Sequence, residues 1–489
     1  MDKDLESIQQ ARTLLAQAQA AQARATDMTQ EEIDRIVHSM AQAAMRESGR
    51  LAQMASDETG YGKVEDKLTK NMFAARDVYE SIKDKKTAGI ISRDDKKKVW
   101  EIAEPVGIVA GIIPSTNPTS TVIFKALIAV KARNAIVFSP HPAAANCTKE
   151  AAEVVKRAAE QAGAPEGLIS CLAIPSVAGA NELMTHALTD LILATGGSDM
   201  VRAAYSSGKP AYGVGPGNVP VYIHSSAQIR QAVADIIRSK TFDYGTICAS
   251  EQALVVERSI RRKFKSELES QGAYFLDDYE KKRVGSIILS GGRLNPRIVG
   301  QSPQKLAEMA GIAIPDDCKV LVAEEENIGK EYPFSLEKLS PILAFYTADD
   351  WQEAMDISRR LLKMGGLGHT FGIHSEDPQI VEKVALSQET FRIVVNSGTT
   401  FGGIGATTEI MPSMTLGCGT LGNNITSDNI TVDHLMNIKR VAYGVRKLEM
   451  ETPSANYQQP VSVGTQQQAS VSRDEIIDIV KAVMQELKL

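Results

Sequence analysis

The chain has few cysteines, no zinc-type motif and almost no excess of charge. Its 489 residues include five cysteines, an odd number, without a Cys-x-x-Cys pair or a His/Cys cluster at zinc spacing. This argues against a disulfide framework or a metal site and favours a reducing compartment. The formal net charge of −6 leaves no basic surplus to neutralise a phosphate backbone, so we expect no nucleic-acid partner.

Long apolar runs and secretion motifs are also missing. No apolar run reaches the roughly 18 residues of a membrane span. The first residues, MDKDLE, lack the cationic and apolar regions of a signal peptide. We therefore expect a cytoplasmic protein without membrane contact. The length allows two or three domains at about 100 to 200 residues each.

Helical and strand-like segments alternate along most of the chain. Residues 5–25 are rich in Ala and Gln, and a capping box at Thr29–Glu32 begins a second helical stretch, which predicts an N-terminal helical layer. The alternation that follows predicts an α/β fold with a doubly wound parallel sheet. The expected strands are 106–113, 135–138, 191–194, 219–223, 252–257, 319–323, 342–346 and 391–396.

One thiol is distinguished by its surroundings. Cys248 lies between a glycine turn and a strand-like apolar run within residues 242–256. This position suits a nucleophile, because a thiolate attacks carbonyl groups well and needs little activation. An isolated cysteine is more often a small buried apolar residue, so the segment alone leaves both interpretations open.

Two further segments favour the catalytic interpretation. Residues 112–119 contain Asn117 and Pro118, and residues 335–341 contain Glu337. In this order, with the Cys248 segment, they resemble the aldehyde dehydrogenase superfamily over about residues 5–450. The likeness is greatest to CoA-acylating enzymes, namely the aldehyde dehydrogenase half of bifunctional alcohol/aldehyde dehydrogenases and the propionaldehyde dehydrogenases of bacterial microcompartments.

The resemblance implies an aldehyde dehydrogenase-like fold and a division into domains. N-terminal helices and an NAD(H)/CoA-binding domain of the variant Rossmann type would occupy residues 1–226, with the main boundary at 225–227. An α/β catalytic domain would occupy residues 227–428. Residues 429–451 would return to the first domain and form a small arm, through which relatives assemble as dimers or tetramers.

The ordinary dinucleotide fingerprint is absent, since no G-x-G-x-x-G lies between a strand and a helix. The resemblance nevertheless implies NAD(H) on a variant sheet and no metal, with the choice between NAD and NADP left open. Glu337 would bind the nicotinamide ribose, although a surface carboxylate is the alternative interpretation. The other cofactor-binding residues would be Ile113, Pro114, Ser139, Pro140 and His141 on the adenosine side, and Gly197 and Ser198 near the pyrophosphate or nicotinamide.

One departure from the family bears on the reaction. Hydrolytic relatives carry a glutamate before a Leu-Gly-Gly turn, where it activates water, but the matching residues 211–218 contain no carboxylate. Water attack on an acyl-cysteine should then be slow, which leaves the intermediate to a thiol. We therefore expect conversion of a short-chain aldehyde, propionaldehyde or acetaldehyde, with CoA and NAD to acyl-CoA and NADH. A hydrolytic enzyme and a catalytically silent scaffold are the alternatives.

The resemblance also assigns roles within the site. Cys248 would be the nucleophile, and the Asn117 amide would stabilise the oxyanion. His369 would be the base for the CoA thiol, because imidazole titrates near neutrality, although a lone histidine is more often structural. Residues Thr400, Phe401 and Ile404 would border the aldehyde pocket.

The C-terminal residues have a different character. Residues 452–470 are rich in Gln and contain Pro and Gly, which predicts a disordered linker. A capping box at Ser472–Glu475 and apolar residues at helical spacing predict an amphipathic helix within 471–489. Such a helix gains stability on a partner, or on its own protein body. It resembles the encapsulation peptides of microcompartment enzymes, which implies a shell or cargo protein as partner.

Overall fold

The computed structural model describes residues 2–448 and 472–486, and contacts divide the chain into two compact units, Met1–Val441 and Ala442–Leu489. The second unit contains α16 (Arg473–Glu486), which confirms the helix predicted within 471–489. The linker predicted at 452–470 lies outside the described residues. Among the residues described, no helix is both long and apolar enough to cross a bilayer.

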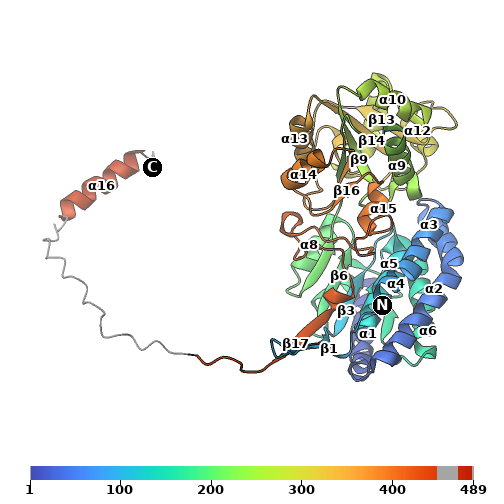
Figure 1. The fold of residues 1–489 in the computed structure, drawn as a ribbon, viewed down its shortest axis with the longest axis vertical. Coiled ribbons are helices and arrows are strands. Elements are labelled where there is room, and N and C mark those ends of the chain that lie inside the picture. Colours follow the sequence, from blue (N-terminus) through green and yellow to red (C-terminus); the bar gives the residue numbers. More distant parts are fainter. Residues whose placement is uncertain (1, 449–471, 487–489) are drawn as a thin grey trace. The chain divides into compact units, whose positions relative to one another are not determined.

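Two long helices begin the first unit, as predicted. They are α1 (Lys3–Thr26) and α2 (Gln30–Thr59), and the capping box of Thr29 and Glu32 is formed. Small side chains such as Ala11, Ala18 and Ala21 are buried on α1, which lets the helix lie close to the body of the unit. Figure 1 shows both helices along the part of the unit that contains β3 and β6.

A five-stranded parallel sheet forms the core of that part. Its strand order is β5-β4-β3-β6-β7. The chain leaves β3 towards β4 and leaves β6 towards β7, so the direction of winding changes between β3 and β6. In open α/β sheets ligands bind at the carboxyl ends of the strands at such a point. The strands are β3 (Ile108–Ile112), β4 (Ala135–Ser139), β5 (Ile169–Cys171), β6 (Leu191–Thr195) and β7 (Ala211–Val214), and the helices among them are α5 (Pro118–Lys131), α6 (Ala145–Gln161), α7 (Val177–Thr185) and α8 (Ser198–Tyr205).

A seven-stranded parallel sheet forms the other core, with the order β10-β13-β14-β9-β8-β15-β16. Apolar residues of α9 (Ile229–Thr241) and α10 (Arg261–Ser270) pack on one face. The other face is covered by α11 (Asp278–Ile288), α12 (Pro303–Ala310), α13 (Trp351–Leu362) and α14 (Pro378–Ser387). The strands are β8 (Val219–Ile223), β9 (Glu251–Glu257), β10 (Ala273–Phe275), β13 (Val320–Glu324), β14 (Ile342–Ala348), β15 (Phe371–His374) and β16 (Ile393–Val395). The predicted α/β fold with parallel sheets is confirmed.

One expected strand lies in the other sheet, and one hairpin was not expected. The strand at 219–223 was grouped with the first domain, but β8 lies in the second sheet, so the chain changes sheets between Val214 and Val219, before the boundary expected at 225–227. Residues 89–105 form an unpredicted hairpin of β1 (Gly89–Asp94) and β2 (Val99–Pro105), whose turn is rich in charge. From residue 436 the chain returns to this hairpin, because β17 (Met436–Ala442) lies beside β2.

Candidate active site

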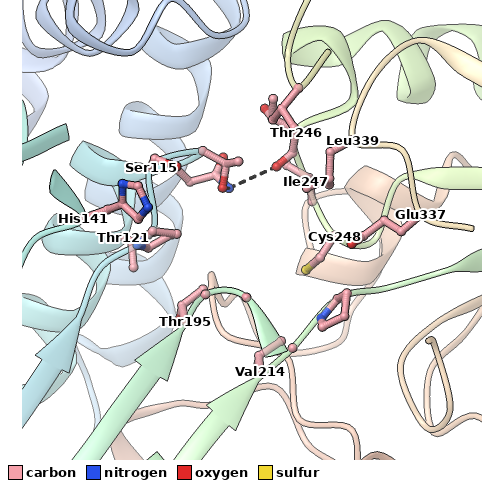
Figure 2. A pocket seen from close by; sticks show the side chains of 18 of the residues that line it. Ser115, Thr121, His141, Thr195, Val214, Thr246, Ile247, Cys248, Glu337 and Leu339 are labelled. Atoms are coloured by element: carbon pink, nitrogen blue, oxygen red, sulfur yellow. Dashed lines mark hydrogen bonds between the residues drawn. The ribbon is translucent and has the colours of Figure 1, made fainter. Parts of the chain in front are cut away.

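A cavity of about 310 Å³ lies where loops of the two sheets meet. One wall comes from the loops that follow β3, β6 and β7, and the other comes from the residues before β9 and β14. Figure 2 shows Ser115, His141 and Thr195 across the cavity from Thr246 and Cys248. The cavity therefore opens at the point of the first sheet where the winding direction changes.

Cys248 lies on a tight turn at the cavity wall. The N–H of Ser250 donates to the carbonyl of Ile247 at 2.9 Å, and this turn leads directly into β9. The Cys248 sulfur faces the space between the two walls (Figure 2). Burial, together with the nearby Glu337 carboxylate, raises the pKa of the Cys248 thiol to about 12. The resting thiol therefore keeps its proton at neutral pH, and a base must remove it before attack.

The backbone before Cys248 adopts an unusual conformation. Asp243, Tyr244 and Gly245 have φ angles of +47°, +51° and +77°. Two consecutive non-glycine residues in the left-handed region cost of order 1–3 kcal/mol each. Such a conformation persists only where the surrounding structure holds it, so the contacts of Asp243 matter to the position of the thiol.

Asn117 lies opposite this turn, at the start of α5. Its Nδ2 donates to the Thr246 carbonyl at 3.2 Å and to the Thr116 hydroxyl at 3.1 Å. Its Oδ1 accepts from the ammonium of Lys70 at 2.6 Å. One N–H of the amide therefore points towards the segment that carries Cys248, which is the orientation an oxyanion donor needs.

Glu337 is the only carboxylate among the described residues that line the cavity. Its Oε1 accepts from the Gly217 N–H at 2.9 Å. Burial raises the pKa of Glu337 to about 7, although the Gly217 N–H and the ammonium of Lys240 oppose the shift. Figure 2 shows this side chain reaching in beside Cys248. Glu337 is thus a cavity group that titrates near neutrality.

His369 lies behind the wall rather than in the lining. Its side chain is buried, and Nδ1 is paired with the Thr370 hydroxyl at 2.9 Å. Burial, aided by Arg392, lowers the pKa of His369 to about 3, so the expected titration near neutrality does not occur in this environment. Its Nε2 has no hydrogen-bond partner among the described residues.

Gly217 separates His369 from Cys248. A Cβ atom at Gly217 would collide with the Cys248 carbonyl and lie 3.2 Å from His369 Cε1. Only glycine fits between the two groups. His369 is therefore a close neighbour of the cysteine backbone, while its ring is shielded from the cavity.

The residues expected at the cofactor divide into two groups. Pro114, His141, Gly197 and Glu337 line the cavity, whereas Ile113, Ser139 and Pro140 are buried and do not line it. Of Ser198, only the backbone position, as the first residue of α8, is described.

Gly197 borders open space. A Cβ atom placed on it would meet no atom within 4 Å, so a ligand can approach the backbone where α8 begins. A helix N-terminus attracts anionic groups through its free N–H donors. Together with the change of winding at β3 and β6, this fits the pyrophosphate of a dinucleotide.

The aldehyde-pocket residues expected from the sequence are placed differently from one another. Ile404 lines the cavity, but Thr400 and Phe401 do not. Thr400 is fully buried and bonded to Ser239, and the Phe401 ring packs edge-on against Phe242 with centroids 4.9 Å apart. The apolar lining instead includes residues that no motif indicated, namely Tyr61, Met414 and Leu416. Among the described residues, no three His, Cys, Asp or Glu side chains come together to hold a metal ion.

Comparison with known proteins gives close matches. Residues 5–332 match the aldehyde dehydrogenase family. An acetylating aldehyde dehydrogenase of Geobacillus thermoglucosidasius, known from a crystal structure, is 66% identical; the match covers 92% of this chain and 100% of that chain, with a TM-score of 0.91.

Two other relatives are less similar. The bifunctional aldehyde-alcohol dehydrogenase of Escherichia coli K12 is 46% identical over 434 residues, which are 88% of this chain and 49% of that protein. The chain therefore spans about half the length of this curated relative. A propionaldehyde dehydrogenase from the fucose utilisation bacterial microcompartment of Clostridium phytofermentans is 27% identical, with a TM-score of 0.79, over 88% of this chain and 97% of that chain. These matches confirm the fold predicted from the sequence.

Proposed function

The chain belongs to the aldehyde dehydrogenase family, and we propose that it is a CoA-acylating aldehyde dehydrogenase. It oxidises a short-chain aldehyde with NAD and passes the acyl group from Cys248 to CoA, giving acyl-CoA and NADH. One observation carries the proposal: the Cys248 sulfur faces a cavity, and the wall at residues 211–218, where hydrolytic relatives hold their water-activating glutamate, has no carboxylate.

The first half of the reaction uses Cys248 and Asn117. Glu337, the carboxylate that lines the cavity beside Cys248, takes the proton of the thiol; the thiolate then adds to the aldehyde carbon, and the carbonyl oxygen becomes an oxyanion. The Asn117 amide and the Cys248 backbone N–H stabilise this charge as it develops. When bound, NAD accepts the hydride that leaves the same carbon. The acyl group then remains on the Cys248 sulfur as a thioester.

Several residues of the chain fit NAD. Gly197 leaves room beside the start of α8, and Pro114, His141 and Glu337 line the same cavity. Ser198 follows Gly197 directly and supplies the next backbone position. Ile113, Ser139 and Pro140 are buried and adjoin the lining residues Pro114 and His141 in sequence.

The second half of the reaction needs a base for the CoA thiol. His369 stays a candidate through its unpaired Nε2, but Glu337 is favoured because it lines the cavity and its pKa, raised by burial, is about 7. A base of this strength readily takes a proton from a thiol of pKa about 8.5. CoA sulfur then bonds to the acyl carbon, and the bond to Cys248 breaks.

A small aliphatic aldehyde fits the apolar part of the lining. Ile404, Met414 and Leu416 contribute it. One relative is called acetylating and another is a propionaldehyde dehydrogenase. Propionaldehyde is the first choice and acetaldehyde the second. A pocket distinguishes one methylene by only about 1 to 3 kcal/mol, so both should react.

One assay separates this function from the alternatives. NADH absorbance is followed with purified protein, aldehyde and NAD, with and without CoA. A CoA-acylating enzyme gives sustained turnover only with CoA and releases acyl-CoA. Equal turnover without CoA, with release of free acid, indicates the hydrolytic enzyme, and no NADH in any mixture indicates the silent scaffold.

The C-terminal helix gives the chain a docking element. Apolar residues of α16, including Ile476, Ile479, Val480 and Val483, are exposed within the described residues. We assign them to a microcompartment shell or cargo protein, which places the enzyme in the cytoplasm inside such a compartment. Deleting residues 453–489 should preserve turnover and abolish this association.

The hairpin of β1 and β2, together with β17, supplies the arm for a dimer or tetramer. Sedimentation can distinguish these two assemblies.

A further inference from the structure

A cluster of buried charges lies beneath the catalytic turn, away from the cavity lining. Lys67 and Lys70 project from α3 (Val64–Met72) and are 2% and 3% exposed, and Asp243 is fully buried. Both ammonium groups contact Asp243 Oδ2, Lys67 at 3.0 Å and Lys70 at 2.5 Å. No motif of the sequence indicated either lysine.

Lys70 differs from Lys67 in what else it reaches. Its Nζ also donates to Asn117 Oδ1 at 2.6 Å and to the Thr246 hydroxyl at 2.9 Å. An ammonium has three N–H donors and no acceptor, so these three contacts use all of them. One cation thus joins the oxyanion residue, the strained turn and the residue two positions before Cys248.

The contact with Asn117 fixes the direction of its amide. Because the ammonium can only donate, it pairs with Oδ1 and leaves Nδ2 to donate to the Thr246 carbonyl and the Thr116 hydroxyl. The opposite orientation would place two donors against each other. A charged donor at Oδ1 also draws electron density from the amide, which strengthens its N–H groups as donors.

The contact with Asp243 holds the left-handed backbone. Asp243 also accepts from the Lys63 N–H at 2.7 Å and from the Thr246 hydroxyl at 2.8 Å. Gly62 has a φ of +72°, and a Cβ atom there would collide with the Asp243 carboxylate. The glycine therefore admits the carboxylate to the position where Lys70 meets it.

We propose that Lys70 is a positioning residue for the oxyanion site: its ammonium orients and polarises the Asn117 amide and ties it to the turn that carries Cys248. This inference rests on the proposed function, because it concerns the charge that develops when Cys248 attacks an aldehyde. Lys67 shares the Asp243 contact but not the Asn117 contact, which makes it the matched control.

The proposal has a consequence for pH dependence. Burial lowers the pKa of Lys70 to about 8, although Asp243 opposes the shift. The charged groups that face it are Asp243, Lys67 and Asp66. The positioning cation is present below this pH and is lost as pH rises through it. NADH formation should therefore fall above about pH 8.

The test compares Lys70→Met with Lys67→Met in the full-length protein. Each variant leaves Asp243 one lysine. The readout is the rate of the NADH burst in a single turnover. KM for aldehyde, KM for NAD and the pH profile of the burst are measured separately. Lys70→Met should slow the burst about 10- to 100-fold, which is less than the roughly 10²- to 10³-fold found when an oxyanion donor itself is removed, and leave KM for aldehyde and NAD within about twofold. Lys70→Gln keeps a neutral donor and should lose less.

Two further results sharpen the test. The fall above about pH 8 should disappear in Lys70→Met and remain in Lys67→Met. In an Asn117→Ala background, Lys70→Met should cause little further loss, because the two residues act as one unit. Three results support the proposal. The burst rate falls in Lys70→Met but not in Lys67→Met, it falls less in Lys70→Gln, and the decrease of the burst rate above about pH 8 is absent in Lys70→Met.

Other outcomes overturn the proposal. Equal losses in the two lysine variants, or a full additional loss in the Asn117→Ala background, would reduce Lys70 to a structural residue. If Lys70→Met fails to fold, Lys70→Gln takes its place, and a pH profile of the burst that is unchanged from wild type in this variant counts against the proposal. A wild-type protein that forms no NADH from any short aldehyde contradicts the proposed function itself, and the inference with it.

Discussion

Two clusters of buried charge lie near Cys248, and they differ in how their charges are paired. In the first, Lys67 and Lys70 contact Asp243 directly. Burial alone would raise the pKa of Asp243, but the two ammonium groups hold it at about 2. The carboxylate therefore stays ionised at any pH at which the enzyme works.

The second cluster surrounds Glu337. The lysines there donate to neutral oxygens: Lys240 to the Gln252 amide at 3.4 Å, and Lys338 to the backbone carbonyls of Phe334 and Leu336. Without a direct ion pair among the described residues, burial raises the pKa of Glu337 to about 7 and lowers that of Lys240. The same residue types thus give a carboxylate that stays ionised in one place and a carboxylate that exchanges a proton near neutrality in the other.

The comparison separates geometry from proton transfer. The Asp243 cluster holds the turn before Cys248 and orients Asn117. In the Glu337 cluster, the carboxylate exchanges a proton with the thiol of CoA. Substitutions in the first should change stability and the burst rate. Substitutions in the second should change the transfer of the acyl group to CoA.

The largest effect is expected at Glu337. With preformed acyl-enzyme freed of NADH, Glu337→Gln should slow transfer to CoA about 10²- to 10⁴-fold, the range for loss of a general base. The base acts when deprotonated, so wild-type transfer should increase as pH rises through about 7, and the variant should lack this increase. Stopped-flow measurement of acyl-CoA release checks this without the cofactor-binding role of Glu337.

His369→Gln is the control for this step. It should retain the increase near pH 7. If His369→Gln loses transfer and the increase while Glu337→Gln keeps both, then the histidine is the base and the proposed division between the two clusters fails.

Asp243→Asn should have the largest effect on stability. It leaves two buried ammonium groups without their counter-charge, which costs about 3–5 kcal/mol of unfolding free energy for a broken buried pair. Denaturant unfolding at pH 7 measures this. Asp235→Asn on α9, away from the cluster, is the control; Asp235 accepts from the Gln231 side chain in an exposed pair. A loss below about 1 kcal/mol at Asp243 would show that the pairing is not required.

Gly62→Ala should have a smaller effect on the same cluster. The added Cβ atom would collide with the Asp243 carboxylate, and the alanine would have to adopt the φ of +72° that Gly62 has. Gly60→Ala is matched, since its φ is +67° and no atom lies within 4 Å of its Cβ. Gly60→Ala should cost about 1 kcal/mol from backbone strain alone. Gly62→Ala should cost about 1–3 kcal/mol more and slow the burst; equal effects in thermal melts and burst rates would contradict the account.

Removal of residues 453–489 should have the smallest effect. Both clusters lie within residues 62–338, in the first unit. Turnover and the pH dependence near 7 should therefore stay within about twofold of the full-length values. A larger change in a steady-state assay would show that the tail contributes to the catalytic body.

Local patterns predicted much of the fold and the chemical identity of the site. Capping at Thr29 and the apolar strands depend on neighbours in sequence, and these were predicted correctly. Cys248, Asn117 and Glu337 stand in recognisable segments, and the structure brings all three to one cavity.

Long-range contacts were outside the reach of such patterns. Lys70 and Asp243 are 173 residues apart, and nothing near either residue shows that they meet. The apolar sequence of β8 would suit a buried strand in either sheet. The chain passes from one sheet to the other in residues 215–218, and the apolar pattern does not show this change. Thr400 and Phe401 stand next to a glycine-rich segment that suggested a pocket, yet packing on Ser239 and Phe242 turns them away from it.

The account is tested most directly by mass spectrometry of the protein after reaction with aldehyde and NAD. Without CoA, the peptide containing Cys248 should carry one acyl group, and addition of CoA should remove it as acyl-CoA. An unmodified Cys248 in a preparation that forms NADH, or an acyl group lost to water as quickly as to CoA, would contradict the central claim.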